Sequence, residues 1–408
     1  MNSNPTPSPA GSLLELNRAP WQRRTMATAA IAILAGCFLP PDIHAQLAVS
    51  SNDNKVLNIE GVNTVVRNPA PDTVTIIDLG VSPPRVIGDV IAPGSWASPP
   101  QSVAVAPDES IALVTASTKI DPANPLRTIA DDTVTVIDLK STPPAVLATL
   151  HAGLGPAGVS INPAGTLALV ANRNEGTVSV FTIAGRQVTP AGKVDLGEPT
   201  CTPSLPVFTP DGKRAFVTRN GDHKLSILSI EGTHVEYTRR DVSVNLRPYG
   251  IQIAPKGDFA FVANIGNGPT GGADMLTVVD IAAEPPRAID SVNVGLIPEG
   301  IALSPDGAYL AVMVMNGSNL ARTSPFFRDF GLLKIMRVAG PKLTPIAEAR
   351  IGHWCEGIVW SRNQRTVLVQ CMNEKDIQVF GFDGRALKPQ PAIKVSGGPA
   401  GIRTAERR

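Results

Sequence analysis

Two glutamates occupy the same position in two copies of a short repeated segment, where a pair of carboxylates could serve as acid and base. Glu299 lies in "PEGIALSPDG" and Glu356 in "CEGIVWSRNQ". When two carboxylates share a confined place, their environments separate their pKa values, so that one keeps a proton while the other accepts one. Arg247 and His353 lie one and two residues before the start of a repeat copy. These four residues are the catalytic candidates.

The two glutamates belong to a repeat that runs through the chain. A typical copy has a Pro, a Gly two places later, alternating aliphatic residues and a turn, as in "PYGIQIAPKG". The copies begin at Pro100, Pro156, Pro203, Pro248, Pro298, Cys355 and Pro399. A second apolar run such as "LALVANR", a third such as "DTVTVIDL" and a weaker fourth follow in each unit. Units of roughly 45 residues with four short strands are typical of propeller blades.

The sequence therefore predicts an all-β, seven-bladed β-propeller of four-stranded antiparallel blades. Residues 46–404 should form this single domain, followed by a short basic tail at 405–408. One blade is shared between the chain ends: residues 46–91 supply its second, third and fourth strands, and residues 397–404 supply the first. Closing the ring in this way leaves no exposed sheet edge. The 36 Gly and 38 Pro residues suit the many turns.

Two stretches resemble the YVTN-repeat family of bacterial β-propellers: "LVANRNEGTVSVFTI" at residues 169–183 and "SPDG" at 304–307. The resemblance covers about residues 46–404 and implies the same propeller fold. Seven-bladed lactonases and cyclases are more distantly similar. The lactonases carry Arg and His directly after the repeat Pro, but this chain has Ser204, Tyr249 and Glu299 at such positions. No catalytic residue is therefore transferred from that family.

Strand order indicates which face of the propeller should carry a site. The residue after each repeat Pro should stand at one mouth of the central channel: Gln101, Ala157, Ser204, Tyr249, Glu299, Glu356 and Ala400. His151, Arg247, His353 and Trp354 come from the loops that lead into these strands. Long insertions at residues 53–71, 118–131, 266–274 and 317–331 should lie on the same face, where binding sites are common. The alternative is a hydrated polar ring without a function.

The insertion at 317–331 is rich in aromatic residues. It contains Phe326, Phe327 and Phe330, three of the 11 phenylalanines in the chain. Phe326 and Phe327 could form a lid or a contact for a ligand or partner, or they could pin the loop onto the blades.

Ligand-binding candidates are thus Gln101, His151, Ser204, Tyr249, Trp354, Phe326 and Phe327. No metal or other cofactor is expected, because motifs such as CxxC and HExxH are missing and neither His223 nor His234 has partners at metal-ligand spacing. Loop aspartates leave calcium open. A formal net charge of +1 gives no basic field for nucleic acid.

Two of the four cysteines fall in places that the repeat interprets. Alignment of the copies pairs Cys355 with Cys371 across two neighbouring strands, so they should form either a disulfide or two buried thiols. Cys201 would then have no partner.

The first 45 residues predict an export signal with a long polar start. Arg23 and Arg24 precede the apolar run "MATAAIAIL", which is too short to span a bilayer. Two alternatives follow: cleavage after Ala45, or lipidation at Cys37 in the lipobox-like "LAGC". The protein should be periplasmic or secreted, with membrane attachment only through a lipid at Cys37, and we expect a monomer.

Two hypotheses of different class follow. In the first, the exported propeller binds a small ligand or a protein partner at its channel mouth without catalysis. In the second, it hydrolyses or cyclises a lactone or a small organic acid, with Glu299 or Glu356 as base and Arg247 holding a carboxylate.

Overall fold

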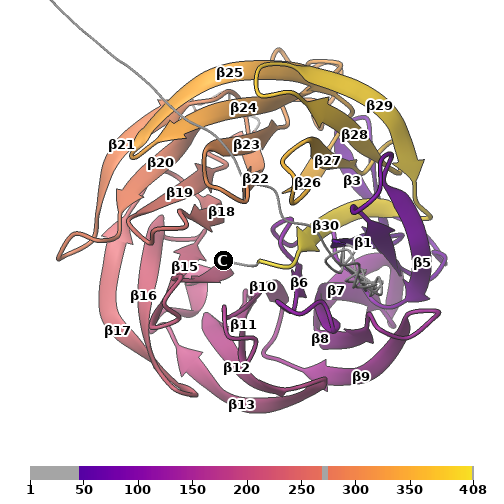
Figure 1. The fold of residues 1–408 in the computed structure, drawn as a ribbon. Coiled ribbons are helices and arrows are strands. Elements are labelled where there is room, and N and C mark those ends of the chain that lie inside the picture. Colours follow the sequence, from indigo (N-terminus) through magenta and orange to yellow (C-terminus); the bar gives the residue numbers. More distant parts are fainter. Residues whose placement is uncertain (1–45, 269–273, 407–408) are drawn as a thin grey trace, which may run out of the picture. The chain divides into compact units, whose positions relative to one another are not determined.

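A ring of β-sheets surrounds a central channel in the computed structural model, which describes residues 46–268 and 274–406 (Figure 1). Seven sheets have four antiparallel strands each, and one further pair of strands, β2 and β3, forms a separate hairpin. The predicted all-β, seven-bladed propeller is confirmed. In the part of the chain that the structure describes, no helix is long and apolar enough to cross a membrane.

The strands of each blade follow one another in sequence from the channel outwards. The first three complete blades are β6–β9 (Val103–Val105, Ile111–Asp121, Asn124–Asp138, Ala145–His151), β10–β13 (Pro156–Ile161, Leu167–Asn172, Thr177–Ala184, Gln187–Asp195) and β14–β17 (Pro203–Phe208, Arg214–Arg219, Lys224–Glu231, His234–Ser243). The next three are β18–β21 (Pro248–Ile253, Phe259–Asn264, Met275–Asp280, Arg287–Asn293), β22–β25 (Pro298–Leu303, Tyr309–Val314, Gly331–Ala339, Lys342–Ile351) and β26–β29 (Cys355–Trp360, Thr366–Cys371, Asp376–Phe382, Leu387–Lys394). A short 3-10 helix, η1 (Pro199–Cys201), precedes β14.

The seventh blade joins the two ends of the chain, as predicted. β30 (Gly398–Thr404) is its inner strand and pairs with β1 (Leu47–Asp53), which is followed by β4 (Thr73–Asp78) and β5 (Arg85–Ile91). Ala48 lies opposite Thr404, and Asp53 lies opposite Gly398. This pairing completes the seventh blade and closes the ring.

Burial follows the position of a strand within its blade. All six residues of an inner strand such as β10 are buried, whereas most residues of the outer strand β9 are exposed. Neighbouring blades cover both faces of the inner strands, so most residues of these strands are apolar and the polar ones, such as Ser160 and Gln252, are buried as well. The repeated aliphatic runs therefore form the layers between blades.

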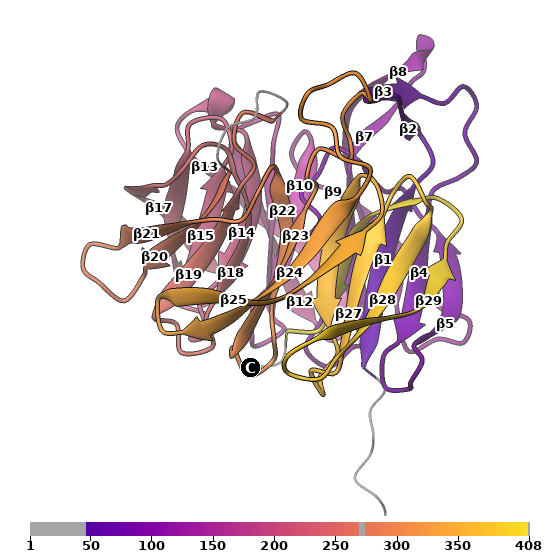
Figure 2. The ribbon, with the colours of Figure 1, turned by 90° about the horizontal axis from the view of Figure 1, so that it is seen from above.

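Two insertions differ from the loops that the sequence predicted. Within residues 53–71, strands β2 (Val56–Ile59) and β3 (Val62–Val65) form a hairpin. Residues 118–131 are not a loop: β7 and β8 continue past the blade and pair along this segment, with Thr118 opposite Ala130. Figure 2 shows both projections on the same side of the ring, opposite the C-terminal end. β-Branched residues favour extended strands, so these segments pair with each other instead of forming irregular loops.

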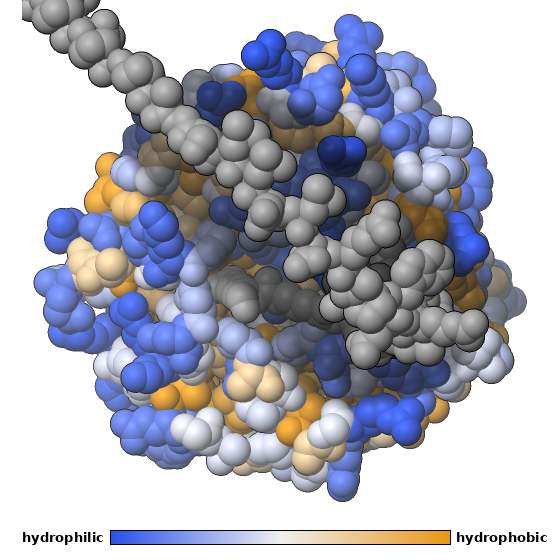
Figure 3. All heavy atoms as spheres, in the orientation of Figure 1, coloured by the Kyte–Doolittle hydropathy of each residue, from blue (hydrophilic) through white to orange (hydrophobic). Residues whose placement is uncertain are grey.

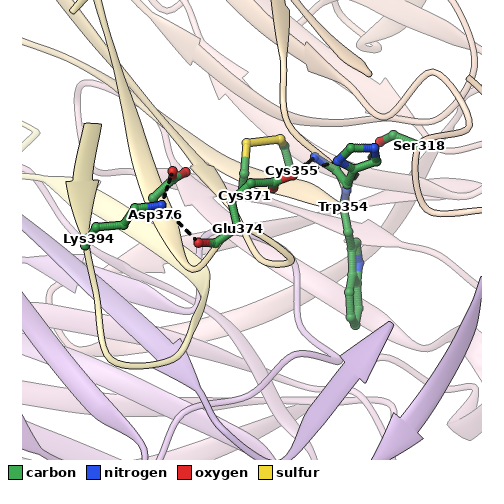
Figure 4. Close-up of a disulfide and its surroundings, with 8 residues drawn as sticks. Ser318, Trp354, Cys355, Cys371, Glu374, Asp376 and Lys394 are labelled. Carbon is green, nitrogen blue, oxygen red and sulfur yellow. Dashed lines mark hydrogen bonds and ion pairs between the residues drawn. A yellow bond between two sulfur atoms is a disulfide. The ribbon is translucent and has the colours of Figure 1, made fainter. Parts of the chain in front are cut away.

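The register predicted around the cysteines is confirmed. Cys355 lies opposite Cys371, and the two form a disulfide (Figure 4). Cys201 is a buried free thiol. Cys37 and the predicted export signal lie outside the described residues, so both stay predictions.

Candidate functional site at the channel mouth

The inner strands all begin at one end of the channel, which we call the channel mouth, and six of the seven begin with the same irregularity. The paired register of β18 with β19 shifts between Pro248 and Ile251, so Tyr249 and Gly250 together face a single residue of the partner strand. Corresponding shifts place Ala157, Ser204, Glu299, Glu356 and Ala400 in bulges. A β-bulge turns a side chain away from its regular direction and is common beside functional sites. The predicted ring residues, except Gln101 before the regular strand β6, are thus the bulged residues of their blades.

The glycine of the repeat has a packing reason at this end. A Cβ atom on Gly158 would lie 2.5 Å from the carbonyl oxygen of Ser204, and one on Gly250 would lie 2.6 Å from the carbonyl oxygen of Glu299. Each glycine therefore lets its strand approach the bulged residue of the next blade. This contact brings successive ring residues close together around the channel.

A left-handed residue precedes the inner strand in five blades. The φ angles are 71° at Gly155, 43° at Thr202, 56° at Arg247, 58° at Ile297 and 46° at Trp354. Such a conformation costs a non-glycine residue of order 1–3 kcal/mol and persists only where the surroundings hold it.

Side chains from the preceding blade hold three of these left-handed residues. The backbone amide of Arg247 donates to Nδ1 of His223 at 3.1 Å, and that of Trp354 donates to Oγ of Ser318 at 3.3 Å. The amide of Ile297 donates to a carboxylate oxygen of Asp274 at 2.7 Å. His223 and Asp274, which the sequence did not point to, thus fix the backbone at the channel mouth.

Glu299 and Glu356 come together as predicted and form a buried pair. Their exposed fractions are 9% and 3%, and their carboxyl groups are hydrogen-bonded to each other. Burial raises the pKa of both groups, and the charge of Glu299 raises the pKa of Glu356 further, well above its ordinary value. The pKa of Glu356 is thus raised more than that of Glu299, although a hydrogen bond with Trp354 acts in the opposite direction.

Two arginines supply positive charge next to this pair. The charges of Arg247 and Arg173 both lower the pKa of Glu299, against the larger effect of burial. Arg173 donates to Oγ of Ser204 at 3.0 Å and to Oδ1 of Asn220 at 3.3 Å, and its guanidinium lies 5.7 Å from the centre of the Tyr249 ring. Sequence reasoning missed Arg173 because it follows a second strand, away from the repeat start.

Asp274 is a further ionisable group beside the channel mouth. Burial raises its pKa to about 6, although the hydrogen bond from Ile297 and the charge of Arg247 act in the opposite direction.

Several buried polar atoms around the channel mouth have no hydrogen-bond partner within residues 46–268 and 274–406. They are Gln101 Oε1, Glu299 Oε2, Thr202 Oγ1, Asn220 Nδ2 and Trp96 Nε1. Gln101 is only 3% exposed, and its Nε2 lies 3.3 Å from the place where a Gly250 Cβ would be. Buried polar groups are nearly always paired, so an unpaired set in one place calls for an explanation. A bound ligand or ordered water would satisfy these atoms.

One residue predicted beside the channel mouth lies elsewhere. His151 ends the outer strand β9, has a side chain 68% exposed and pairs with Asp132 at 3.1 Å, so its predicted place at the channel mouth is wrong. The outer strand of a blade lies at the periphery of the ring, so its last residue lies there too and not beside the channel.

His353 is held by carboxylates on both ring nitrogens. Its Nδ1 lies 2.6 Å from Glu374 and its Nε2 lies 3.0 Å from Asp329. Burial lowers the pKa of His353, but these two hydrogen bonds and charges outweigh burial and raise it. His353 thus connects Asp329, in residues 317–331, with Glu374 of the last complete blade.

The aromatic residues of 317–331 differ from one another in their surroundings. Phe327 lies under the Arg322 guanidinium at 5.5 Å and Phe330 under that of Arg350 at 4.2 Å, whereas Phe326 is exposed. Asn316 donates to the carbonyl of Phe330 at 3.1 Å. Phe327 and Phe330 thus anchor this segment, and Phe326 alone is presented to solvent.

Metal ligands are not grouped at this site. Among the described residues, no three His, Cys, Asp or Glu side chains are arranged to hold a metal ion.

Comparisons with known proteins support the fold. No family model and no curated protein matches the sequence. A putative 6-phosphogluconolactonase from Bacteroides fragilis NCTC 9343 is similar in structure, with a TM-score of 0.67 and 17% identity over 90% of this chain and 99% of that one. A functionally unknown protein from Desulfotomaculum acetoxidans DSM 771 has a TM-score of 0.66 and 12% identity over 89% and 100%.

The periplasmic gluconolactonase of Pseudomonas aeruginosa is also similar, with a TM-score of 0.60 and 17% identity over 88% of this chain and 98% of that one. At these identities the likeness concerns the fold alone. The chain is thus a seven-bladed β-propeller whose structural neighbours are lactonase-like proteins and propellers of unknown function.

Proposed function

We propose that this protein is an exported β-propeller, of the YVTN-repeat type, that binds a small polar ligand at its channel mouth without transforming it. The observation that carries the proposal is the set of unpartnered buried atoms around Glu299 and Glu356. They offer both acceptors, such as Gln101 Oε1, and donors, such as Asn220 Nδ2. Because these atoms are buried, a small molecule satisfies them better than the flat surface of a protein partner would.

Export is supported by the disulfide, because disulfides persist in oxidising compartments and are rare in the cytoplasm.

The test is a screen of small polar metabolites against the whole protein by thermal shift. A ligand present at about 100 times its dissociation constant stabilises the protein by about 2.7 kcal/mol. The shift should disappear in Glu299→Gln and persist in Glu348→Gln, which changes an exposed glutamate on the outer strand β25. Hits whose shift survives in Glu299→Gln, or the lack of any hit, would contradict binding at the channel mouth.

Hydrolysis of a lactone is a second candidate, and the proton-sharing carboxylate pair favours it. In that reaction Glu299 removes a proton from water as the water oxygen bonds to the acyl carbon. The ring C–O bond breaks, and protonated Glu356 gives its proton to the departing oxygen. The hydrogen bond between the two carboxyls then returns the proton from Glu299 to Glu356, and the arginines stabilise the negative charge on the acyl oxygen.

The second candidate needs a separate assay. Hydrolysis of gluconolactone should be followed above its spontaneous rate for the whole protein and for Glu299→Gln and Glu356→Gln. Losses of about 100-fold or more in both variants would support the reaction, since general acid–base catalysis contributes on that scale. Equal rates in the protein and its variants would rule out these roles.

A further inference from the structure

A cavity of about 290 Å³ lies at the end of the channel opposite the channel mouth. Four neighbouring inner strands line it where they end: β18, β22, β26 and β30. Figures 1 and 2 show that the C-terminal segment leaves β30 on this face, opposite the β2–β3 hairpin. Pockets for drug-sized ligands begin at about 300 Å³, so the cavity suits a small molecule.

Apolar residues make up somewhat more than half of the lining of this cavity. Ile253, Leu303, Val359 and Trp360 line it together with Pro255 and Pro305. Figure 3 shows that hydrophilic side chains predominate on the outer part of the same face, with apolar residues scattered among them. The apolar lining therefore calls for a ligand with an apolar body.

Most polar side chains at the cavity are already engaged. Gln46 donates from Nε2 to the carbonyl of Trp360 at 3.1 Å, and its Oε1 accepts from the amide of Arg362. Ser304 donates to Asp306 at 2.6 Å, and the Trp360 indole donates to the carbonyl of Ala302 at 3.0 Å. These groups hold the cavity walls in place.

Gln252 differs from these neighbours. It is the next-to-last residue of β18, it is only 8% exposed, and its Nε2 is buried without a hydrogen-bond partner among the described residues. An amide left unpaired in an apolar place costs about 1–3 kcal/mol, which a ligand oxygen in the cavity would recover.

The charged side chains at the cavity are paired with one another. Arg362, Arg403 and Glu406 line it, which gives two guanidinium groups and one carboxylate. Arg362 donates to Glu109 at 3.2 Å, and Arg403 forms an ion pair with Glu406. Each arginine thus has a carboxylate partner, so the Gln252 donor is the group that a ligand carboxylate would use in the cavity.

We propose that this end of the channel binds a small monocarboxylate with an apolar body, whose carboxylate accepts a hydrogen bond from Gln252. The apolar body lies against Trp360 and Leu303. This site is separate from the channel mouth and does not depend on the function proposed there.

The probe is octanoate, titrated calorimetrically into the whole protein, with octanol as the uncharged molecule of the same chain length. Octanoate should bind at least about tenfold more tightly than octanol, because hydrogen bonds to charged groups are worth about 1.5–3 kcal/mol. Gln252→Met keeps the length of the side chain and removes the donor, and it should weaken octanoate binding by about tenfold.

Gln187→Met is the matched control, because it makes the same change at an exposed position of the outer strand β13 and should leave octanoate binding unchanged. Circular dichroism confirms that both variants are folded. The proposal is overturned if octanoate fails to bind, if octanol binds equally well, or if Gln252→Met binds octanoate as the parent protein does. A second, independent readout is NMR spectroscopy, in which octanoate should slow the hydrogen exchange of the Gln252 side-chain NH₂ group.

Discussion

The two ends of the channel are built by the same seven inner strands, yet they differ in backbone and chemistry. At the channel mouth six of the seven strands begin with a bulge, five blades add a left-handed residue, and ionisable side chains meet. At the opposite end the strands lead into regular turns, in which Ser304 and Asp306 or Thr209 and Asp211 bond to each other. The repeat thus forms regular turns at the end opposite the channel mouth, whereas the side chains at the channel mouth differ from blade to blade.

The difference between the two ends indicates which of them can hold reactive groups. A regular turn uses its polar atoms to satisfy its own backbone, as Asp306 does when it accepts the amide of Ala308 at 2.9 Å. A bulge leaves its residue outside the ladder of hydrogen bonds, so Glu299 and Glu356 can turn toward each other. The channel mouth therefore concentrates charge, and the opposite end offers an apolar cavity.

The largest expected effect comes from the disulfide at the channel-mouth end of β26. Replacing both Cys355 and Cys371 by serine should lower the free energy of unfolding by about 3 kcal/mol, because the closed loop no longer restricts the unfolded chain. Denaturant unfolding measures this loss, and hydrogen exchange should show faster opening at Glu356 than at the turn around Asp306. Reductant should destabilise the parent protein and leave the double variant unchanged; an equal response of both would contradict the prediction.

Two glycine substitutions compare the ends directly. Gly300→Ala should cost about 2 kcal/mol, because the new Cβ would run into the backbone of Glu356 in the next blade. Gly212→Ala, in a turn at the opposite end, has nothing within 4 Å of the new Cβ and a φ of 67°, so it should cost about 1 kcal/mol from the left-handed backbone alone. Chemical denaturation of the two variants tests the order. A larger loss for Gly212→Ala would show that the blades do not approach closely at the channel mouth.

The carboxylate pair should make stability depend on pH in a defined direction. The pKa of Glu356 is raised above its ordinary value of 4.5, so the folded protein keeps a proton that the unfolded chain releases. Its stabilising contribution is therefore complete below pH 4.5 and is lost as the pH rises through the raised pKa. Glu356→Gln keeps a donor toward Glu299 without titrating.

The stability of Glu356→Gln relative to the parent protein should accordingly increase from pH 5 to pH 8. Urea unfolding across this range provides the measurement, with Glu348→Gln as the exposed control. A difference that is constant with pH would mean that the two carboxyls do not share a proton.

The smallest effect concerns the segment that His353 holds beside the channel mouth. The pKa of His353 is raised above 6.5, so its bonds to Asp329 and Glu374 are strongest below that pH and weaken as the pH rises through the raised value. Trypsin cleavage at Arg322 and Arg328, normalised to a peptide substrate, should therefore accelerate modestly between pH 6 and pH 8.5. His353→Gln should be cleaved at the faster rate throughout, and a parent protein without pH dependence would contradict this role.

Much of the fold and part of the candidate site could be predicted from the sequence. The repeat period gave the number of blades, and its symmetry about each turn gave the pairing of Cys355 with Cys371. The residue after the repeat Pro predicted where Glu299 and Glu356 lie. These inferences succeeded because strand pairing is set by the local pattern, in which a shift of one residue would expose every buried side chain.

Only the tertiary structure decided the rest. Arg173 reaches Tyr249 from another blade, Gln101 approaches Gly250 across the ring, and His151 turns outwards. Long polar side chains have many rotamers of similar energy, so their final contacts depend on neighbours that are distant in sequence. The cavity beside Gln252 likewise exists only where four inner strands end together. The sequence alone thus determined the ring and the glutamates at its mouth, whereas packing between blades determined which charges meet there and where an apolar space remains.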